Sequence, residues 1–403
     1  MRQSTGSHSD AVINGGDNET SRRQFLSRSL LAAGAMLLNP WEISFATSPQ
    51  RSVEGIHPKL TGAVLFDNEP DIRKDEVVGA ELGARLFTDL STLEEQNLVV
   101  PAGKFYIRTG PSKILPVTEN WAIRIRGRQV SNSLRMQQLE AESVSMGASV
   151  MECAGNTRAT GFGLISAGNW GGIPIGKLLD GVKQRPKQIL FSGFDEYAAL
   201  STSSIAGASW IFNPDQLLAH DSFLATHLNG ARLTADHGGP FRLVVPGFYG
   251  CANIKWVNEI VLLDDEESES TSQMLEYASR THQSGLPSLA REYEPPLVEP
   301  AAMPIRVERW QAGADSYEVV GIAWGGRNVE REWEIQFNPD EEYEQIRNIE
   351  VLPGRYTWAL WRYKWKPTRT GTFHIQLRPR NSAIPARRVK SGHYMRSLTI
   401  NKV

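Results

Sequence analysis

The stretch HGGPFRLVVPG (His237–Gly247) carries the most informative pattern in this 403-residue sequence. Its apolar run Leu243–Val245 is bounded by proline and glycine, which predicts a short buried strand. The polar residues before the run stand beside loop glycines, and sites are often built at such strand ends. A similar loop follows the apolar run Ile189–Phe191, where Asp195 is a candidate site residue. The pattern predicts a domain of strands and loops with a site at the strand ends.

A second loop contains one of the two cysteines of the chain. MECAGNTR (Met151–Arg158) follows the predicted strand Met146–Val150 and places Cys153 among residues that suit a turn. A thiolate is a soft ligand that suits transition metals. However, no second cysteine or His/Cys spacing suggests a zinc or iron–sulfur site, and no Cys-x-x-Cys-His motif suggests a c-type haem. The residues alone leave Cys153 as a nucleophile, a single metal ligand, an inert cysteine or half of a disulfide with Cys251.

The first residues of the chain predict an export signal. Ser21-Arg-Arg-Gln-Phe-Leu26 has the twin-arginine pattern, the apolar stretch Leu30–Leu38 follows, and Ser44-Phe-Ala46 supplies the small residues of a cleavage site. We therefore predict a signal peptide over residues 1–46, against the alternative of a short amphipathic helix, and a periplasmic protein if the cell has two membranes. The twin-arginine route carries folded proteins, often with a cofactor already inserted, so we expect a complex cofactor.

The composition is that of a globular protein, with 40% apolar and 22% charged residues. The net charge of −2 gives no electrostatic reason to bind nucleic acid or an anionic membrane surface. After the signal peptide, no run of about 18 apolar residues could span a bilayer. We therefore expect no nucleic-acid partner and no transmembrane segment in the mature chain.

A charged and proline-rich segment divides the chain. Acidic residues begin at Asp264 and prolines continue to Pro300, a composition typical of a domain boundary. From Pro304 onward, short alternating segments such as Thr357–Trp365 are separated by turn residues, which predicts an immunoglobulin-like β-sandwich. The fold class is therefore α+β. We predict a catalytic domain over residues 47–285, a linker over 286–303 and the sandwich over 304–403.

Four segments of the chain resemble the sulfite oxidase family of molybdenum enzymes. Cys153-Ala-Gly-Asn-Thr-Arg158 resembles the cysteine loop of that family, and Phe223–Gly230, His237–Gly247 and Ile254–Val257 resemble its downstream segments in order and spacing. Residues 304–403 resemble its dimerisation domain more weakly. The resemblance implies an exported, bacterial sulfite dehydrogenase-like member. It implies a mixed α/β molybdopterin-binding domain followed by the immunoglobulin-like domain.

The resemblance also implies roles for individual residues. Cys153 would donate its thiolate to molybdenum, which one molybdopterin otherwise holds, and a soft sulfur donor suits that metal. Arg108 and Arg158 would form a pocket for an anion close to the metal. A surface salt bridge is the alternative for any one of these cations taken alone. The residues expected to bind the pterin and phosphate of the cofactor are His237, Arg242, Lys255 and, with weaker support, Asp195.

The chain departs from the family pattern around the substrate. Thr109-Gly110 stand where the family has Asn-His, and Ala206 stands at the position of the active-site tyrosine of sulfite-oxidising members. The segment Ala159–Gly163 lacks the family's tryptophan, and the third pocket arginine has two candidates, Arg387 and Arg388. We therefore expect a conserved metal site and a rebuilt substrate pocket.

The implied activity is oxygen-atom transfer between a small anionic substrate and water. The family default is oxidation of sulfite or a related sulfur oxyanion, with two electrons passed onward. Because the chain has no haem motif and no b5-type domain, we expect a separate cytochrome to accept the electrons, and the family allows a homodimer. Two alternatives stay open: a reductase of S-oxides or N-oxides with the same cofactor, and an inactive, cofactor-free binding or assembly protein.

Overall fold

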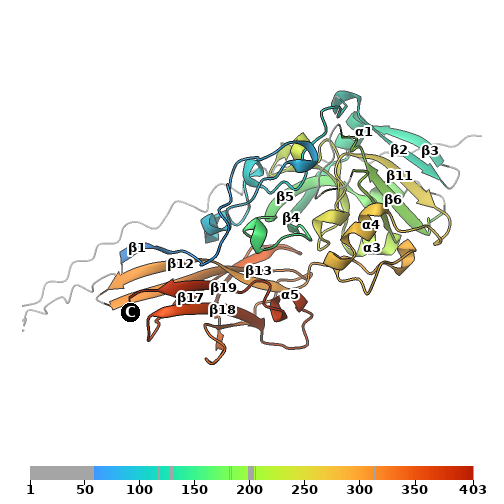
Figure 1. Ribbon diagram of the computed structural model, residues 1–403. Helices are drawn as coiled ribbons and strands as arrows, with labels where there is room; N and C mark the ends of the chain where they lie inside the picture. Colours follow the sequence, from blue (N-terminus) through green and yellow to red (C-terminus); the bar gives the residue numbers. More distant parts are fainter. Residues whose placement is uncertain are drawn as a thin grey trace, which may run out of the picture. The chain divides into compact units, whose positions relative to one another are not determined.

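The computed structural model describes residues 59–116, 118–127, 130–180, 182, 184–197, 204, 206–312 and 314–402. The predicted signal peptide lies outside the described residues. The described part of the chain belongs to one unit and forms four β-sheets with short helices between them (Figure 1). None of its helices has the length and apolar character needed to cross a membrane.

The cysteine loop and the HGGPF loop adjoin strands of one antiparallel sheet. The sheet has the order β10-β8-β5-β4, and β9 pairs with β8. β4 ends directly before Cys153, and β10 begins at Arg242, so both predicted strands are confirmed. β8 is buried at nearly every position, as its apolar sequence requires. The strands are β4 (Val144–Glu152), β5 (Ile165–Pro174), β8 (Phe223–Leu228), β9 (Ala231–Arg232) and β10 (Arg242–Val244).

A second sheet, of order β3-β2-β11-β6-β7, brings Asp195 and Lys255 to one edge. β6 and β11 are antiparallel, and Val257 at the start of β11 pairs with Gly193 at the end of β6. Asp195 follows the end of β6, and Lys255 precedes the start of β11. The pairing of these two strands therefore brings the two residues, which are distant in sequence, to the same edge of the sheet. The strands are β2 (Ala122–Gly127), β3 (Val130–Arg135), β6 (Gln188–Gly193), β7 (Ser209–Phe212) and β11 (Val257–Leu263).

The helices are short and begin at recognisable caps. The side chain of Asn213 accepts a hydrogen bond from the backbone N–H of Asp215 at 2.8 Å, and Pro214 takes the first helical position of α3, where no amide is needed. Before β2, 3-10 turns form at Glu81–Gly83, Leu90–Thr92 and Glu95–Asn97. The helices are α1 (Met136–Glu140), α2 (Ile175–Leu179), α3 (Pro214–Ala219), α4 (Ser272–Tyr277) and α5 (Arg387–Lys390).

The C-terminal residues form two further sheets that pack on each other. The Trp365 ring stacks on Phe337 with ring centroids 4.2 Å apart and meets Phe373 edge-on at 4.8 Å, so one aromatic cluster joins the sheets. The prediction of a β unit here is confirmed, while its immunoglobulin-like topology stays a prediction. The five-stranded sheet contains β1 (Lys59–Val64), β12 (Ala301–Ala312), β13 (Ala314–Trp324), β17 (Trp358–Trp365) and β16 (Asn348–Val351). The four-stranded sheet contains β15 (Glu344–Gln345), β14 (Trp333–Gln336), β18 (Gly371–Pro379) and β19 (Arg396–Ile400).

The first described strand departs from the predicted domain boundaries. β1 lies within the segment assigned to the catalytic domain, yet it pairs antiparallel with β12 of the C-terminal sheet, with Val64 opposite Val307. Phe66, just after β1, forms an isolated antiparallel bridge with Leu398 of β19 in the four-stranded sheet. Pairing with β1 satisfies backbone groups along an edge of β12 that would otherwise be exposed, which explains why a segment with weak strand character is extended here. The C-terminal β unit is therefore built from both ends of the described chain.

Candidate active site

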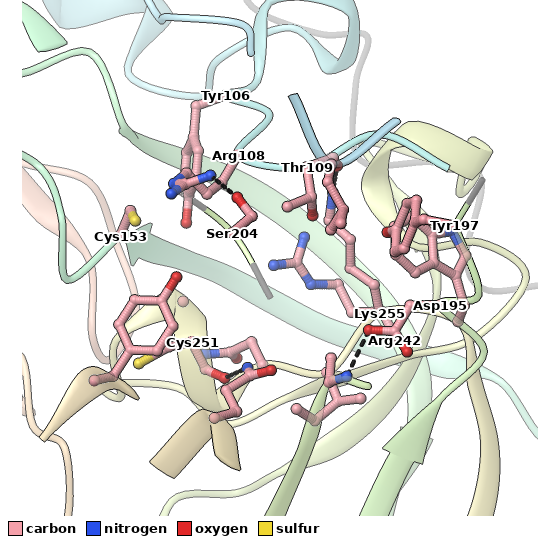
Figure 2. Close-up of a pocket in the computed structure, with 18 residues that line it drawn as sticks. Tyr106, Arg108, Thr109, Cys153, Asp195, Tyr197, Ser204, Arg242, Cys251 and Lys255 are labelled. Atoms are coloured by element: carbon pink, nitrogen blue, oxygen red, sulfur yellow. Dashed lines mark hydrogen bonds between the residues drawn. The ribbon is translucent and has the colours of Figure 1, made fainter. Parts of the chain in front are cut away.

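A cavity opens where the ends of β4, β6, β10 and β11 meet, and Figure 2 shows its lining. The lining residues come from segments distant in sequence, and Cys153 and Asp195 lie on opposite sides of the view (Figure 2). The predicted site residues that line this cavity are Arg108, Cys153, Asp195, Arg242 and Lys255. The structure thus brings five of the seven predicted site residues together.

Arg242 and Lys255 bring buried positive charge into the cavity. Arg242 is 4% exposed, its Nη1 donates to the carbonyl of His237 at 3.3 Å, and its Nε has no hydrogen-bond partner among the described residues. The Nζ of Lys255 donates to the carbonyl of Thr109 at 2.7 Å and to that of Asp236. Burial lowers the pKa of Arg242 to about 10, and burial together with the Arg242 charge sets the pKa of Lys255 well below its usual value. Buried cations held by carbonyls are costly, and a bound anion would offset that cost.

Asp195 is the one acidic residue among the described residues that line this cavity. Its carboxylate accepts a hydrogen bond from the backbone N–H of Ala208 at 2.5 Å. Burial raises the pKa of Asp195, although the backbone hydrogen bonds act in the opposite direction. The carboxylate therefore braces the segment that follows β6 and presents an acceptor to the cavity.

His237 lies outside the cavity lining and holds the HGGPF loop in place. Its Nε2 lies 3.0 Å from the carbonyl of Phe105, and its Nδ1 lies 2.8 Å from the hydroxyl of Thr234. Burial lowers the pKa of His237 to about 4, so the ring is neutral at pH 7, with Nε2–H donating and Nδ1 accepting. His237 thus ties the loop to the segment that carries Arg108, and its predicted contact with the cofactor stays a prediction.

Gly238 lets the HGGPF loop pack directly against the stem of Lys255. Its φ is +96°, and a Cβ there would lie 2.7 Å from Cγ of Lys255. We expect Gly238→Ala to displace the lysine and strain the backbone, with a loss of about 1–3 kcal/mol in the free energy of unfolding. Gly230→Ala is the matched control, because Gly230 has φ +81° but nothing within 4 Å of its added Cβ. If both variants lose the same amount of thermal midpoint, the contact between Gly238 and the stem of Lys255 does not account for the loss.

A second cavity adjoins the first and is lined by four arginines. They are Arg85, Arg108, Arg280 and Arg388. Arg108 lines both cavities, and the cysteine-loop residues Ala154 and Gly155 also face the second one. The described residues that line the second cavity include no carboxylate. This arrangement suits an anion close to the cysteine loop.

Of the two candidates for the third pocket arginine, the structure places Arg388 at the cavity. Its Nη2 donates to the carbonyl of Ala154 at 2.8 Å, within the cysteine loop. Burial lowers the pKa of Arg388, but the Glu152 carboxylate, Tyr249 and Tyr394 together raise it above the usual value, so the charge is secure. Arg387 instead forms an ion pair with Glu299 at 2.7 Å.

Glu152, the residue before Cys153, links the cysteine loop to the C-terminal β unit. Its carboxylate is fully buried and accepts from the indole Nε1 of Trp324 at 2.8 Å and the hydroxyl of Tyr394 at 3.1 Å. The amide of Asn156 donates to it at 3.2 Å, and Nη1 of Arg388 lies 3.8 Å away. The residue was not predicted as part of the site, although an acidic residue at the end of an apolar strand is a usable signal.

Arg158 begins the 3-10 turn Arg158–Thr160 that follows the cysteine loop. Its Nη2 donates to the carbonyl of Met395 at 2.6 Å, and Arg158 is not among the described residues that line either cavity. Its role as a substrate contact stays a prediction. Arg85, which the sequence analysis missed, lines the second cavity, and its Nη2 donates to Ser204 at 3.2 Å. No sequence signal distinguishes Arg85, because nothing periodic surrounds it.

The two cysteines are both free and buried. The disulfide alternative is therefore not realised in the structure. Burial raises the pKa of the Cys251 thiol above its usual value, so this thiol stays protonated at neutral pH. The backbone carbonyl of Cys251 accepts a hydrogen bond from Gln273 at 2.5 Å. These observations agree with Cys251 as a small buried residue and leave Cys153 as the candidate metal ligand.

Residues 110–271 match the sequence model of the family described as oxidoreductase molybdopterin binding domain. The mitochondrial sulfite oxidase of Drosophila melanogaster is 26% identical over 301 residues, which cover 68% of this chain and 51% of the relative. The sulfite oxidase of Gallus gallus is 28% identical over 354 residues, which cover 80% of this chain and 72% of the relative. The chain therefore contains an oxidoreductase molybdopterin-binding domain and is similar to sulfite oxidases over most of its length.

Other comparisons extend this result to the fold. The NADPH nitrate reductase of Neurospora crassa is 24% identical over 375 residues, which cover 75% of this chain and 36% of the relative. The chain spans about half the length of the Drosophila relative and about a third of the Neurospora one. The crystal structure of the sulfane dehydrogenase SoxCD from Paracoccus pantotrophus superimposes with a TM-score of 0.57 at 18% identity, covering 85% of this chain and 86% of that chain. The likeness to SoxCD shows a common fold.

The first cavity fits the molybdopterin that this family binds. Arg242 offers an unpaired buried Nε and Lys255 a buried ammonium group, and both suit a phosphate. Asp195 offers an acceptor to the pterin, and the sulfur of Cys153 lies at the other side of the cavity (Figure 2). The donor set thus matches an anionic cofactor with a metal that accepts sulfur.

We expect Lys255→Met to lower cofactor content about tenfold, since hydrogen bonds to charged groups are worth about 1.5–3 kcal/mol. The methionine fills the space of the lysine stem but removes the charge that faces the cavity. Molybdenum and pterin content of the purified protein measure the effect. Lys177→Met is the control, because Lys177 is exposed and pairs with Glu142 at the surface. Normal cofactor content in Lys255→Met would remove Lys255 from the binding site.

Proposed function

We propose that this chain is an exported molybdenum-cofactor oxidoreductase that oxidises sulfite or a related sulfur oxyanion and passes two electrons to a separate cytochrome. The observation that carries the proposal is the position of Cys153 and Arg108, where the cofactor cavity adjoins a cavity lined by arginines. The sulfite oxidases among the relatives and the sulfane dehydrogenase of similar fold support a sulfur compound as substrate. The twin-arginine pattern in the sequence supports export.

The residues divide the work of this reaction between cofactor and substrate. Cys153 would hold molybdenum through its thiolate, while Arg242, Lys255 and Asp195 would hold the molybdopterin. The bound cofactor supplies two-electron oxygen-atom transfer, with water as the source of oxygen. Arg108 and Arg388 would hold the oxyanion, because guanidinium groups bind planar pairs of oxygens. Sulfite and water then give sulfate, two protons and two electrons, and the electrons leave to the external acceptor.

A pair of assays tests the direction and the substrate. The purified holoprotein is given sulfite with ferricyanide, and separately methionine sulfoxide or nitrate with reduced viologen. Turnover of sulfite, with molybdenum present in the protein, supports the proposal. Turnover only in the viologen assays would overturn it.

A reductase of S-oxides or N-oxides is the second candidate. Two observations favour it: nitrate reductases are among the relatives, and Ala206 stands where sulfite-oxidising members have a tyrosine. The same cofactor would then take an oxygen atom from the substrate, and the external redox partner would donate the two electrons instead of accepting them. The viologen assays described above distinguish this candidate from sulfite oxidation.

A further inference from the structure

A segment that directly follows the family match lines both cavities. The match ends at residue 271 and α4 begins at Ser272. Tyr277, the last residue of α4, lines the first cavity, and Arg280, in the next 3-10 turn, lines the second. We refer to residues 271–282 as the α4 segment. Tyr277 and Arg280 both lie outside the matched region of residues 110–271.

The α4 segment is held firmly against the cofactor cavity. The hydroxyl of Thr271 caps the helix by accepting from the backbone N–H of Met274 at 3.2 Å, and Met274 is buried. Polar contacts at both ends of the segment add to this anchoring. They are Thr271 Oγ1 to the carbonyl of Ser209 at 2.6 Å, Gln273 Nε2 to the carbonyl of Cys251 at 2.5 Å, and Thr281 Oγ1 with the hydroxyl of Tyr293 at 2.6 Å. The side chains of Tyr277 and Arg280 are therefore presented from a fixed backbone.

Tyr277 and Arg280 are coupled to each other and to the other arginines. The guanidinium of Arg280 lies 5.3 Å from the centroid of the Tyr277 ring, a cation–π contact. The backbone carbonyl of Arg280 accepts from Nη2 of Arg388 at 3.0 Å. The carboxylate of Glu276 lies 3.8 Å from Arg280, and this exposed pair is weak. The charge of Arg280 is thus available to the second cavity beside those of Arg388 and Arg108.

Tyr277 brings a hydrogen-bond donor to the same region. Tyr277 lines the first cavity together with Cys153 and Arg108, and Arg108 also lines the second cavity. Ala206 stands where the resembled family has a tyrosine, and its side chain has no hydroxyl. In this chain Tyr277, at the end of α4, supplies a phenol to the lining of the first cavity. A neutral phenol donates one hydrogen bond to an oxyanion without adding charge.

We propose that Tyr277 and Arg280 make this site select doubly charged oxyanions over singly charged ones, with Tyr277 donating a hydrogen bond and Arg280 supplying the discriminating charge. Four arginines line the second cavity, and no carboxylate is among its described lining residues. In such a cavity each further unit of negative charge on the ligand adds favourable Coulomb energy. Sulfite and sulfate then bind well, whereas nitrate binds weakly. The inference deepens the proposed function and rests on it for the choice of substrate.

Anion binding tests this inference independently of turnover. Isothermal titration of the holoprotein with sulfate and with nitrate gives the ratio of the two affinities. We expect sulfate to bind more tightly, and Arg280→Gln to lower the sulfate-to-nitrate ratio about tenfold, the effect of one charge-assisted contact. Tyr277→Phe is expected to weaken sulfate binding severalfold. Arg280→Lys, which keeps the charge, should restore part of the preference, while loss of folding would reduce the binding of both anions alike.

Arg291→Gln is the matched control, because Arg291 is an exposed arginine that pairs with Glu267 at the surface. If the sulfate-to-nitrate affinity ratio of Arg280→Gln equals that of Arg291→Gln, the inference is overturned. The test also separates the two proposals. If the protein does not oxidise sulfite but Arg280→Gln still lowers the ratio, the proposed reaction fails and the selectivity stands. If sulfite is oxidised and the ratio is unchanged, only the selectivity fails.

Discussion

Cys153→Ser is expected to lower turnover by about a hundredfold or more, equivalent to ~2.7 kcal/mol of transition-state stabilisation, and to leave the fold intact. Cys153 directly follows β4 and is 4% exposed, and its Sγ accepts from the backbone N–H of Gly155 at 3.4 Å. A serine hydroxyl fits the same space and can accept the same bond. It replaces a soft sulfur donor by a hard oxygen, which suits the proposed metal poorly. Steady-state assays, molybdenum content and thermal midpoint measure the three parts of this prediction.

Cys251→Ser is the matched control for this experiment. Cys251 is also buried, and its thiol stays protonated because burial raises its pKa. We expect this variant to keep most of the activity, with a small loss of stability from burying a hydroxyl. Full turnover in Cys153→Ser, or loss of turnover only in Cys251→Ser, would contradict the assignment of Cys153 as the metal ligand.

The parts of the site that the sequence predicts share a local signal. Cys153, Asp195, Arg242 and Lys255 all stand at strand ends, beside glycines or apolar runs that also set the local structure. Local pattern therefore predicts that each of them stands at a strand end, whereas their common location follows from the pairing of strands, as for Asp195 and Lys255. The resemblance adds their chemistry, since neither periodicity nor composition names a cofactor.

The parts that the sequence does not predict depend on distant contacts. Glu152 acts through Trp324 and Tyr394, and Arg280 acts beside Arg388, all of them far away in sequence. Such arrangements arise from packing between segments, and no local propensity encodes them. The pairing of β1 with β12 is a further case, because the partner edge exists only after the C-terminal sheet has formed.

Glu152→Ala is expected to destabilise the protein by about 3 kcal/mol, the usual cost of breaking a buried ion pair. The substitution leaves the indole N–H of Trp324 and the hydroxyl of Tyr394 without their acceptor, and it removes the carboxylate beside Arg388. Denaturant or thermal unfolding measures the loss. Glu334→Ala is the control, because Glu334 pairs with Arg378 at the surface and such pairs contribute about 0–1 kcal/mol.

The same variant tests whether the C-terminal β unit positions the cysteine loop. Glu152 and Cys153 are adjacent, so release of the carboxylate frees the backbone that carries the proposed metal ligand, Cys153. We expect the Glu152→Gln variant to retain part of the stability and to show a lower kcat. We also expect a higher KM, because Glu152 lies beside Arg388, which holds the oxyanion in the proposed reaction. A double-mutant cycle with Arg388→Gln should give a non-additive effect, since the two residues share one buried network. Additive effects, or unchanged kcat in a destabilised Glu152→Gln, would reduce Glu152 to a residue that stabilises the fold without positioning the site.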